Sequence, residues 1–131
     1  MLKTLTGLLL ITHGLVHWVL VAPHPDVAGS GFAGFLKHSW LVTRAGLDES
    51  TAYLIGMVLL VIVSIGFTVA GIPVFASQAW WRPLAIAMAG ISIVLLALFW
   101  HKWLVVGPVL DVAILVSLIF FKWPSASTIG S

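Results

Sequence analysis

The sequence contains no cysteine and few charged side chains among its 131 residues. Without cysteine the chain can form no disulfide, thiolate nucleophile, iron–sulfur ligand or covalent c-type haem link. Charged residues make up 8% of the sequence, whereas an ordinary soluble domain has roughly 25%. So few charges cannot cover the surface of a soluble domain, and a hydrophobic share of 61% is the opposite of a disordered composition. We therefore expect lipid to surround most of the chain.

The basic residues are few and scattered singly, and the formal net charge is +2. Proteins that bind nucleic acid present a clustered basic patch or stripe instead. We therefore expect no nucleic-acid partner. The expected partners are the lipid bilayer and, within it, another membrane protein or a second copy of the chain.

Four apolar stretches are long enough to cross a bilayer as helices, which takes about 20 residues with a range of about 17–25. The first three contain no Lys, Arg, Asp or Glu, and the fourth contains only Asp111. Because lipid offers no hydrogen bonds to the backbone, each stretch must be a helix. The expected fold class is all-α, an integral membrane antiparallel four-helix bundle that forms one domain over residues 1–131. The expected spans are about 5–22, 53–72, 84–101 and 104–121.

The connections between these spans differ greatly in length. The first connection, about residues 23–52, is long for a bundle, so we expect it to be functional or partly structured. Its segment 29–36 is apolar enough to lie at the membrane interface or to dip into it. Little more than residues 101–103, of which 101 also ends the third span, connects the last two spans, and this predicts a tight hairpin. The tail 124–131 is small and polar, and we expect it to fray.

Residues typical of helix starts and membrane interfaces stand at the ends of the spans. Asp48 to Thr51 are capping residues before the second span, Pro83 suits a first turn, and Gly107-Pro108 starts or kinks the fourth helix. All seven tryptophans fall near span ends or in connections, as an interfacial aromatic belt requires. The residues expected to act as lipid or interface anchors are Arg82, Trp80, Trp81, Trp103 and Trp40.

The positive-inside rule leaves the orientation open, because the basic residues divide equally between the two faces of a four-span protein. The face opposite the termini also holds Asp26, Asp48 and Glu49. Acidic residues count little in that rule and leave only a small bias, toward cytoplasmic termini in a bacterial or archaeal cytoplasmic membrane. The two sets of basic residues are Lys3, Arg82 and Lys122 on the face of the termini, and Lys37, Arg44 and Lys102 on the other.

Polar groups inside the spans gather at one depth. His13 and His17 in the first span lie one helical turn apart on one face, a spacing that suits two ligands of one metal ion. Gly14 between them allows another helix to come close. Asp111 lies roughly 6–8 Å along the fourth span at 1.5 Å per residue, about as deep as His17. We expect His101 to end the third span at the same level.

A charged aspartate at the centre of a membrane helix costs about 2.5–3.5 kcal/mol and therefore needs a partner. In one hypothesis, His13 or His17 bonds to Asp111 and simply joins the first span to the fourth. In a second, His13, His17, Asp111 and His101 hold a transition metal. In a third, His13 or His17 is the axial ligand of a haem or chlorin. In a fourth, a proton passes between His17 and Asp111.

Hydroxyl side chains in the spans are expected to donate to carbonyls of their own helices, and none has the paired base of a nucleophile. These side chains belong to Thr12, Ser64, Thr68, Ser92 and Ser117.

Several short motifs carry a resemblance to known sequences. They are H-G-L-V-H-W in the first span, S-W-L-V in the long connection, G-F-T-V-A-G at the end of the second span, W-W-R-P-L before the third and G-P-V-L-D-V-A-I-L in the fourth. In these motifs the chain resembles a group of small, uncharacterised bacterial four-span membrane proteins with an H-G-x-x-H motif in the first helix. The resemblance covers most of the chain. It implies that His13, His17, Trp40, Arg82 and Asp111 belong to a shared pattern, and it implies no activity.

Three functions fit these observations. The first is a redox or ligand-handling protein with a metal or haem at the His/Asp site. The second is a non-catalytic accessory or scaffold subunit of a larger membrane complex. The third is a carrier of a small solute or of protons.

Overall fold

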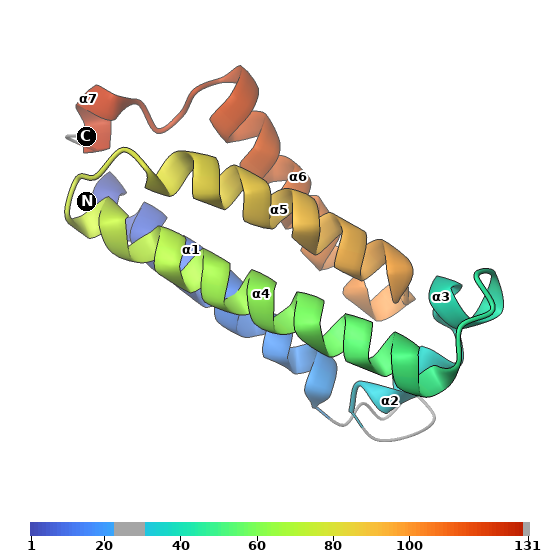
Figure 1. The fold of residues 1–131 in the computed structure, drawn as a ribbon. Coiled ribbons are helices and arrows are strands. Elements are labelled where there is room, and N and C mark those ends of the chain that lie inside the picture. The colour runs from blue at the N-terminus through green and yellow to red at the C-terminus, as the bar shows by residue number, and fades with distance from the viewer. Residues whose placement is uncertain (23–30, 130–131) are drawn as a thin grey trace.

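The computed structural model describes residues 1–22 and 31–129, and these ranges contain helices and no strand (Figure 1). Four of the helical segments are long and apolar enough to cross a membrane, as the sequence predicts. They are Leu2–Val21, Glu49–Phe75, Trp81–Leu98 and Lys102–Phe120.

The first and last of these segments are composite. The first is the α-helix α1 (Leu2–Val16) followed by a 3₁₀ turn, His17–Val21. The last is a 3₁₀ turn at Lys102–Leu104, the α-helix α6 (Val106–Leu115) and a stretch of π-helix, Val116–Phe120. The second and third segments are the continuous helices α4 (Glu49–Phe75) and α5 (Trp81–Leu98).

Helix α4 begins four residues earlier than the sequence predicts, because Asp48 caps it. The Asp48 carboxylate accepts a hydrogen bond from the backbone N–H of Thr51 over 2.9 Å and from the hydroxyls of Ser50 and Thr51. These hydrogen bonds, that from Ser50 first, hold the pKa of Asp48 well below its ordinary value. The cap satisfies donors that the first turn of a helix leaves without partners.

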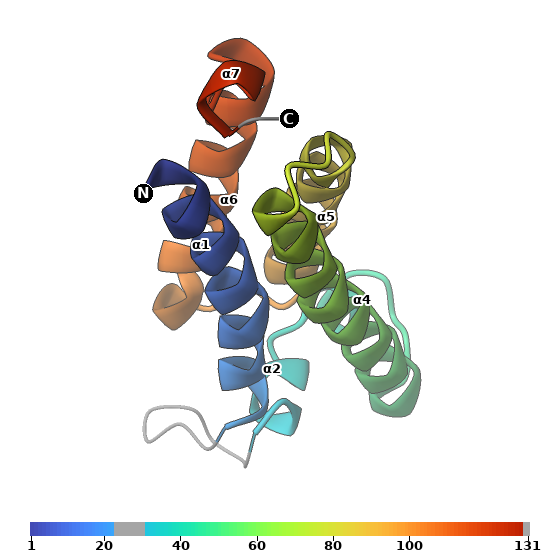
Figure 2. The same ribbon diagram turned by 90° about the vertical axis from the view of Figure 1, so that its left-hand side faces the viewer.

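The long helices pack in the order α1, α4, α5, α6, so that α1 lies on α4, α4 on α5 and α5 on α6 (Figures 1 and 2). Small residues allow these close approaches. A Cβ added to Gly14 of α1 would lie 2.7 Å from the Ser64 carbonyl oxygen of α4. A Cβ on Gly66 of α4 would lie 1.9 Å from the sulfur of Met88 in α5. The expectation that Gly14 brings another helix close is therefore confirmed.

The long connection is partly structured, as expected. It contains two single-turn helices, α2 (Ala33–Leu36) and α3 (Trp40–Thr43). Phe32 and Phe35 are each 2% exposed and pack with Phe99 at one end of the long helices. Segment 29–36 therefore contributes to the core over its described part, whereas residues 29 and 30 lie outside the described residues.

The tail differs from the expectation of a frayed end. Residues 126–129 form the short helix α7 (Ala126–Ile129), which contacts α1 at the end of the molecule where the chain begins (Figure 1). The reason is Ile129, which is 2% exposed and packs in the same cluster as Leu10 and Trp81. Its carbonyl also accepts a hydrogen bond from the Ser77 hydroxyl.

Trp81 is not an interface anchor, because its side chain is 1% exposed and belongs to that same core cluster. Trp80, Trp40 and Trp103 are about half exposed, and their role as anchors stays a prediction. Arg82 is engaged within the protein, since its guanidinium donates to the carbonyls of Lys122 and Pro124 and lies over the Trp81 ring.

Candidate functional site

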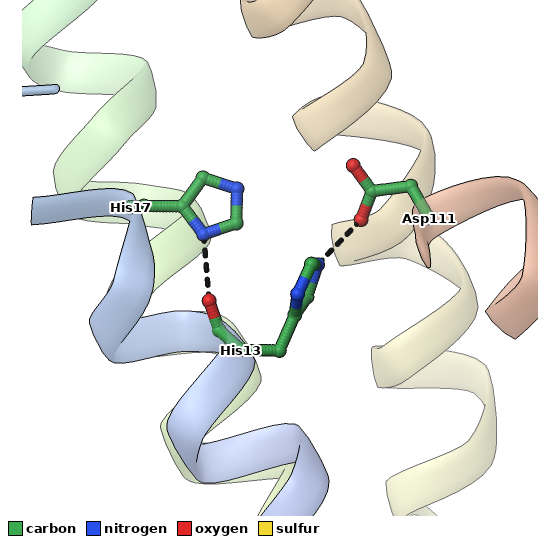
Figure 3. Close-up of side chains that lie close together, drawn as sticks. All are labelled: His13, His17 and Asp111. Carbon is green, nitrogen blue, oxygen red and sulfur yellow. Dashed lines mark hydrogen bonds and ion pairs between the residues drawn. The ribbon is translucent and has the colours of Figure 1, made fainter. Parts of the chain in front are cut away.

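His13 and Asp111 meet in the middle of the molecule, although they are 98 positions apart in the sequence. Nε2 of His13 in α1 lies 2.7 Å from Oδ1 of Asp111 in α6 (Figure 3). His13 is 5% exposed and Asp111 is fully buried. The contact is therefore a short hydrogen-bonded pair that water does not reach on the Asp111 side.

Ser92 of α5 joins the second histidine to the same carboxylate. Its Oγ lies 2.5 Å from Oδ2 of Asp111 and 2.8 Å from Nε2 of His17. Ser92 is 0% exposed and His17 is 4% exposed. We call the four residues His13, Asp111, Ser92 and His17, bonded in that order, the core chain.

His17 uses both ring nitrogens. Nε2 lies against Ser92. Nδ1 lies 2.8 Å from the backbone carbonyl oxygen of His13, four residues earlier in α1 (Figure 3). The two histidine rings meet edge to face with centroids 5.1 Å apart. This geometry confirms the prediction that the two imidazoles share one face of the first span.

Helix α4 supplies the wall behind the histidines. The Phe67 ring is edge-on to His13 with a centroid distance of 4.7 Å, and it stacks with His17 at 6.1 Å. Ser64, one turn earlier, accepts a hydrogen bond of 2.8 Å from the indole N–H of Trp18. All four long segments therefore build the site, whereas the sequence predicts contributions from the first, third and fourth.

The expectation for Ser92 is wrong, because its hydroxyl bonds across helices rather than to its own helix. Thr12 and Thr68 do follow the expectation and donate to carbonyls one turn earlier. Ser92 still makes no hydrolase triad with His17 and Asp111. In such a triad the carboxylate holds the second nitrogen of the histidine, whereas here it contacts the serine oxygen itself.

His101 does not join the site. Helix α5 ends at Leu98, so His101 lies in the extended connection to α6 rather than at the end of a span. Its Nδ1 accepts from the backbone N–H of Trp103, and its ring packs edge-on against Phe35. The predicted metal set is thereby reduced to His13, His17 and Asp111, whose ligand atoms lie within 4.8 Å of one another.

An apolar groove of about 620 Å³ runs beside the core chain, between α1 and α6. It extends from Trp123 and Pro124, near the termini, past His13 to Val16 and Leu110. Among the residues that line it, His13 is the one with a titratable side chain. The groove therefore reaches one end of the core chain.

No family model, curated protein or solved structure matches the chain. The fold and the site define an all-helical protein with four helices of membrane-spanning length and a buried His/Asp/Ser cluster at their centre.

Proposed function

We propose that the chain is an integral membrane protein, an antiparallel four-helix bundle with both termini on one side, and that its core chain holds and shifts a proton inside the membrane. The support for the bundle is composition and length: four segments are long and apolar enough to span, and many of their large side chains are exposed. Lipid is the solvent in which such a surface is stable.

The observation that carries the proton proposal is a count of hydrogens along the core chain. A carbonyl oxygen only accepts, so the contact between His17 Nδ1 and the His13 carbonyl requires a hydrogen on Nδ1. Ser92 contacts both His17 Nε2 and Asp111 Oδ2, and these two hydrogen bonds need two hydrogens. The Ser92 hydroxyl has one, so a neighbour must supply the other.

Two arrangements satisfy this count. In the first, His17 is an imidazolium that donates to Ser92, and Ser92 donates to an Asp111 carboxylate. In the second, Asp111 is a carboxylic acid that donates to Ser92, and Ser92 donates to neutral His17. The two differ by a concerted step in which the hydrogen on His17 Nε2 moves to the Ser92 oxygen and the Ser92 hydrogen moves to Asp111. No bond between heavy atoms changes.

Both arrangements are electrically neutral overall, which a low-dielectric interior favours, because an uncompensated buried charge is costly. In both, His13 donates its Nε2 hydrogen to Asp111 Oδ1. Elsewhere in the long helices the ionisable side chains lie within the first five residues. They are Lys3 in α1, Glu49 and Tyr53 in α4 and Arg82 in α5.

A bound transition metal fits this geometry less well. Ligand atoms about 2.0–2.1 Å from a tetrahedral metal are about 3.3 Å apart, whereas His13 Nε2 and Asp111 Oδ1 are at the hydrogen-bonding distance of 2.7 Å. His17 Nε2 and Asp111 Oδ2 are also already bonded to Ser92. A metal would have to break these contacts, and a tetrapyrrole in the groove would meet His13 but not His17.

Histidine side-chain ¹⁵N NMR of the protein in lipid nanodiscs tests the proposal, together with the infrared carbonyl band of Asp111. We expect one proton at neutral pH, seen as an imidazolium at His17, as a protonated carboxyl at Asp111, or as exchange between them. The variant Asp111→Asn assigns the infrared band. A neutral His17 together with a carboxylate at Asp111 would overturn the proposal.

Two serine variants distinguish a shared proton from a hydrogen-bonded link that only holds the helices together. Ser92→Ala removes the oxygen between His17 and Asp111, so the exchange between them should stop. Ser64→Ala is the matched control on α4 and should leave both signals unchanged. If Ser92→Ala has no more effect than Ser64→Ala, the proton does not pass through Ser92. A stoichiometric metal lost in His13→Ala and His17→Ala, or a Soret band, would replace the proposal with a cofactor site.

A further inference from the structure

The groove between α1 and α6 has the size and lining of a site for a lipid-soluble molecule. Its volume of about 620 Å³ falls in the range of about 300–1,000 Å³ that is usual for small-molecule pockets. Leu5 and Leu9 in its wall are 55% and 52% exposed, so a ligand can reach it from the surrounding lipid. The hydroxyls of Thr6 and Thr12 in the same wall already donate to carbonyls of α1.

His13 lines this groove, and Nδ1 of its ring has no hydrogen-bond partner among the described residues. Nε2 of the same ring is bonded to Asp111. No nitrogen or oxygen of the described side chains is both fully enclosed and without a partner, so Nδ1 retains some accessible surface. Since His13 is 5% exposed and lines the groove, that surface opens into the groove.

The core chain determines what this nitrogen can recognise, and here the argument rests on the proposed function. In both neutral arrangements the hydrogen of His13 is on Nε2, where Asp111 accepts it. Nδ1 therefore presents a lone pair and accepts a hydrogen bond. A ketone or an ether has only acceptor oxygens, so it could not form a hydrogen bond with this lone pair. An ammonium group would bring an unpaired charge into an apolar wall, which is costly.

We infer that the groove binds a lipid-soluble alcohol or phenol whose hydroxyl donates to His13 Nδ1 and whose apolar body lies along α1 and α6. The leucine, isoleucine and alanine side chains of the two helices contact the body. The hydroxyl is held by the one histidine that also belongs to the core chain. The acyl chains of lipids have no hydrogen-bond donor at this depth. They leave Nδ1 without a partner and compete with the ligand for the groove only through apolar contacts.

The test uses para-octylphenol and its methyl ether, which differ by a single hydrogen-bond donor, added to the protein in nanodiscs of fixed lipid content. The readout is the ¹⁵N resonance of His13 Nδ1. We expect a saturable shift with the phenol and none with the ether. One additional hydrogen bond should make the phenol bind about two- to tenfold more tightly than its methyl ether.

Two phenylalanine variants control for partition into the bilayer. Ala113→Phe fills the groove from α6 and should abolish the shift. Ala87→Phe places the same side chain on the exposed surface of α5, away from the groove, and should leave the shift intact. Equal effects of phenol and ether, or a shift that persists in Ala113→Phe, would overturn the inference.

The failure of this inference is distinguishable from that of the proposed function. The shared proton is judged from His17 and Asp111 without any ligand. If those signals show the proton but the phenol and the ether behave alike, only the groove assignment fails. If they show no proton but the phenol alone shifts Nδ1, the groove assignment holds and the core chain is a clip between helices.

Discussion

Replacing Ser92 with alanine is the most direct measure of what the core chain contributes to stability. The hydroxyl makes two buried hydrogen bonds, to His17 at 2.8 Å and to Asp111 at 2.5 Å. Alanine keeps the backbone and the Cβ, so the change removes one oxygen and little packing. Asp111 is 0% exposed, so water cannot easily replace the missing partner.

The expected loss follows from which of two effects is larger. Hydrogen bonds between membrane helices contribute about 0.6 kcal/mol each on average, so two lost bonds alone would cost about 1.2 kcal/mol. A buried polar group left without a partner costs about 1–3 kcal/mol, and Ser92→Ala leaves two such groups. The second effect exceeds the first, and we expect Ser92→Ala to lower the free energy of unfolding by about 2–6 kcal/mol.

Ser64→Ala is again the control, because it removes one hydrogen bond to Trp18, whose side chain is 43% exposed. We expect this variant to lose about 0.6 kcal/mol. Unfolding by a denaturing detergent in mixed micelles, followed by tryptophan fluorescence, gives both values. In an Asp111→Ala background Ser92→Ala should cost less than in the wild type, because one partner is already gone. Equal losses for the two serine variants would refute the reasoning.

Two other changes test the helix contacts and the α4 cap. Gly14→Ala should destabilise the protein by about 1–3 kcal/mol, because its Cβ would meet the Ser64 carbonyl. Gly90→Ala is the control, because no atom lies within 4 Å of its Cβ, and it should be neutral or stabilising in the same unfolding assay. The hydrogen bonds that lower the pKa of Asp48 stabilise the folded protein in full at pH values above the ordinary aspartate pKa. This stabilisation is lost as the pH falls through the lower pKa that Asp48 has in the folded state. Amide exchange at Thr51 should therefore accelerate in acid relative to Asp48→Asn, and equal pH profiles would contradict this.

The helices were largely predictable, because long apolar runs indicate the spans and specific residue types mark the helix starts. Apolar runs with almost no charged residues give the four long segments, and Asp48 and Pro83 mark two starts. Ile129 was not predictable, because a single apolar residue in a serine-rich tail gives no pattern. Its burial depends on the tail folding back to α1, which is a property of the whole molecule.

The pairing of His13 with Asp111 was predictable from depth, whereas the role of Ser92 was missed. A serine in a helix commonly bonds to its own backbone, so residue type alone favours that expectation. A depth argument would have found it. Ser92 is six residues before the end of α5 at Leu98, and Asp111 is five residues after the start of α6 at Val106. In a hairpin these positions lie at nearly the same level.

His13 belongs to both the core chain and the groove, and this predicts that a ligand shifts the proton. A hydroxyl that donates to Nδ1 draws electron density from the ring and makes Nε2–H a stronger donor to Asp111. A stronger donor stabilises the Asp111 carboxylate relative to the carboxylic acid. The proton shared through Ser92 should therefore move toward His17 when the groove is filled.

This coupling has a definite sign and is reciprocal. Adding para-octylphenol should increase the imidazolium signal of His17 and weaken the protonated carboxyl band of Asp111, whereas the methyl ether should change neither. By linkage, a change that keeps the proton on His17 must tighten phenol binding by the same factor. A phenol that binds at Nδ1 but strengthens the carboxyl band would show that the ring does not transmit the ligand's hydrogen bond in this direction.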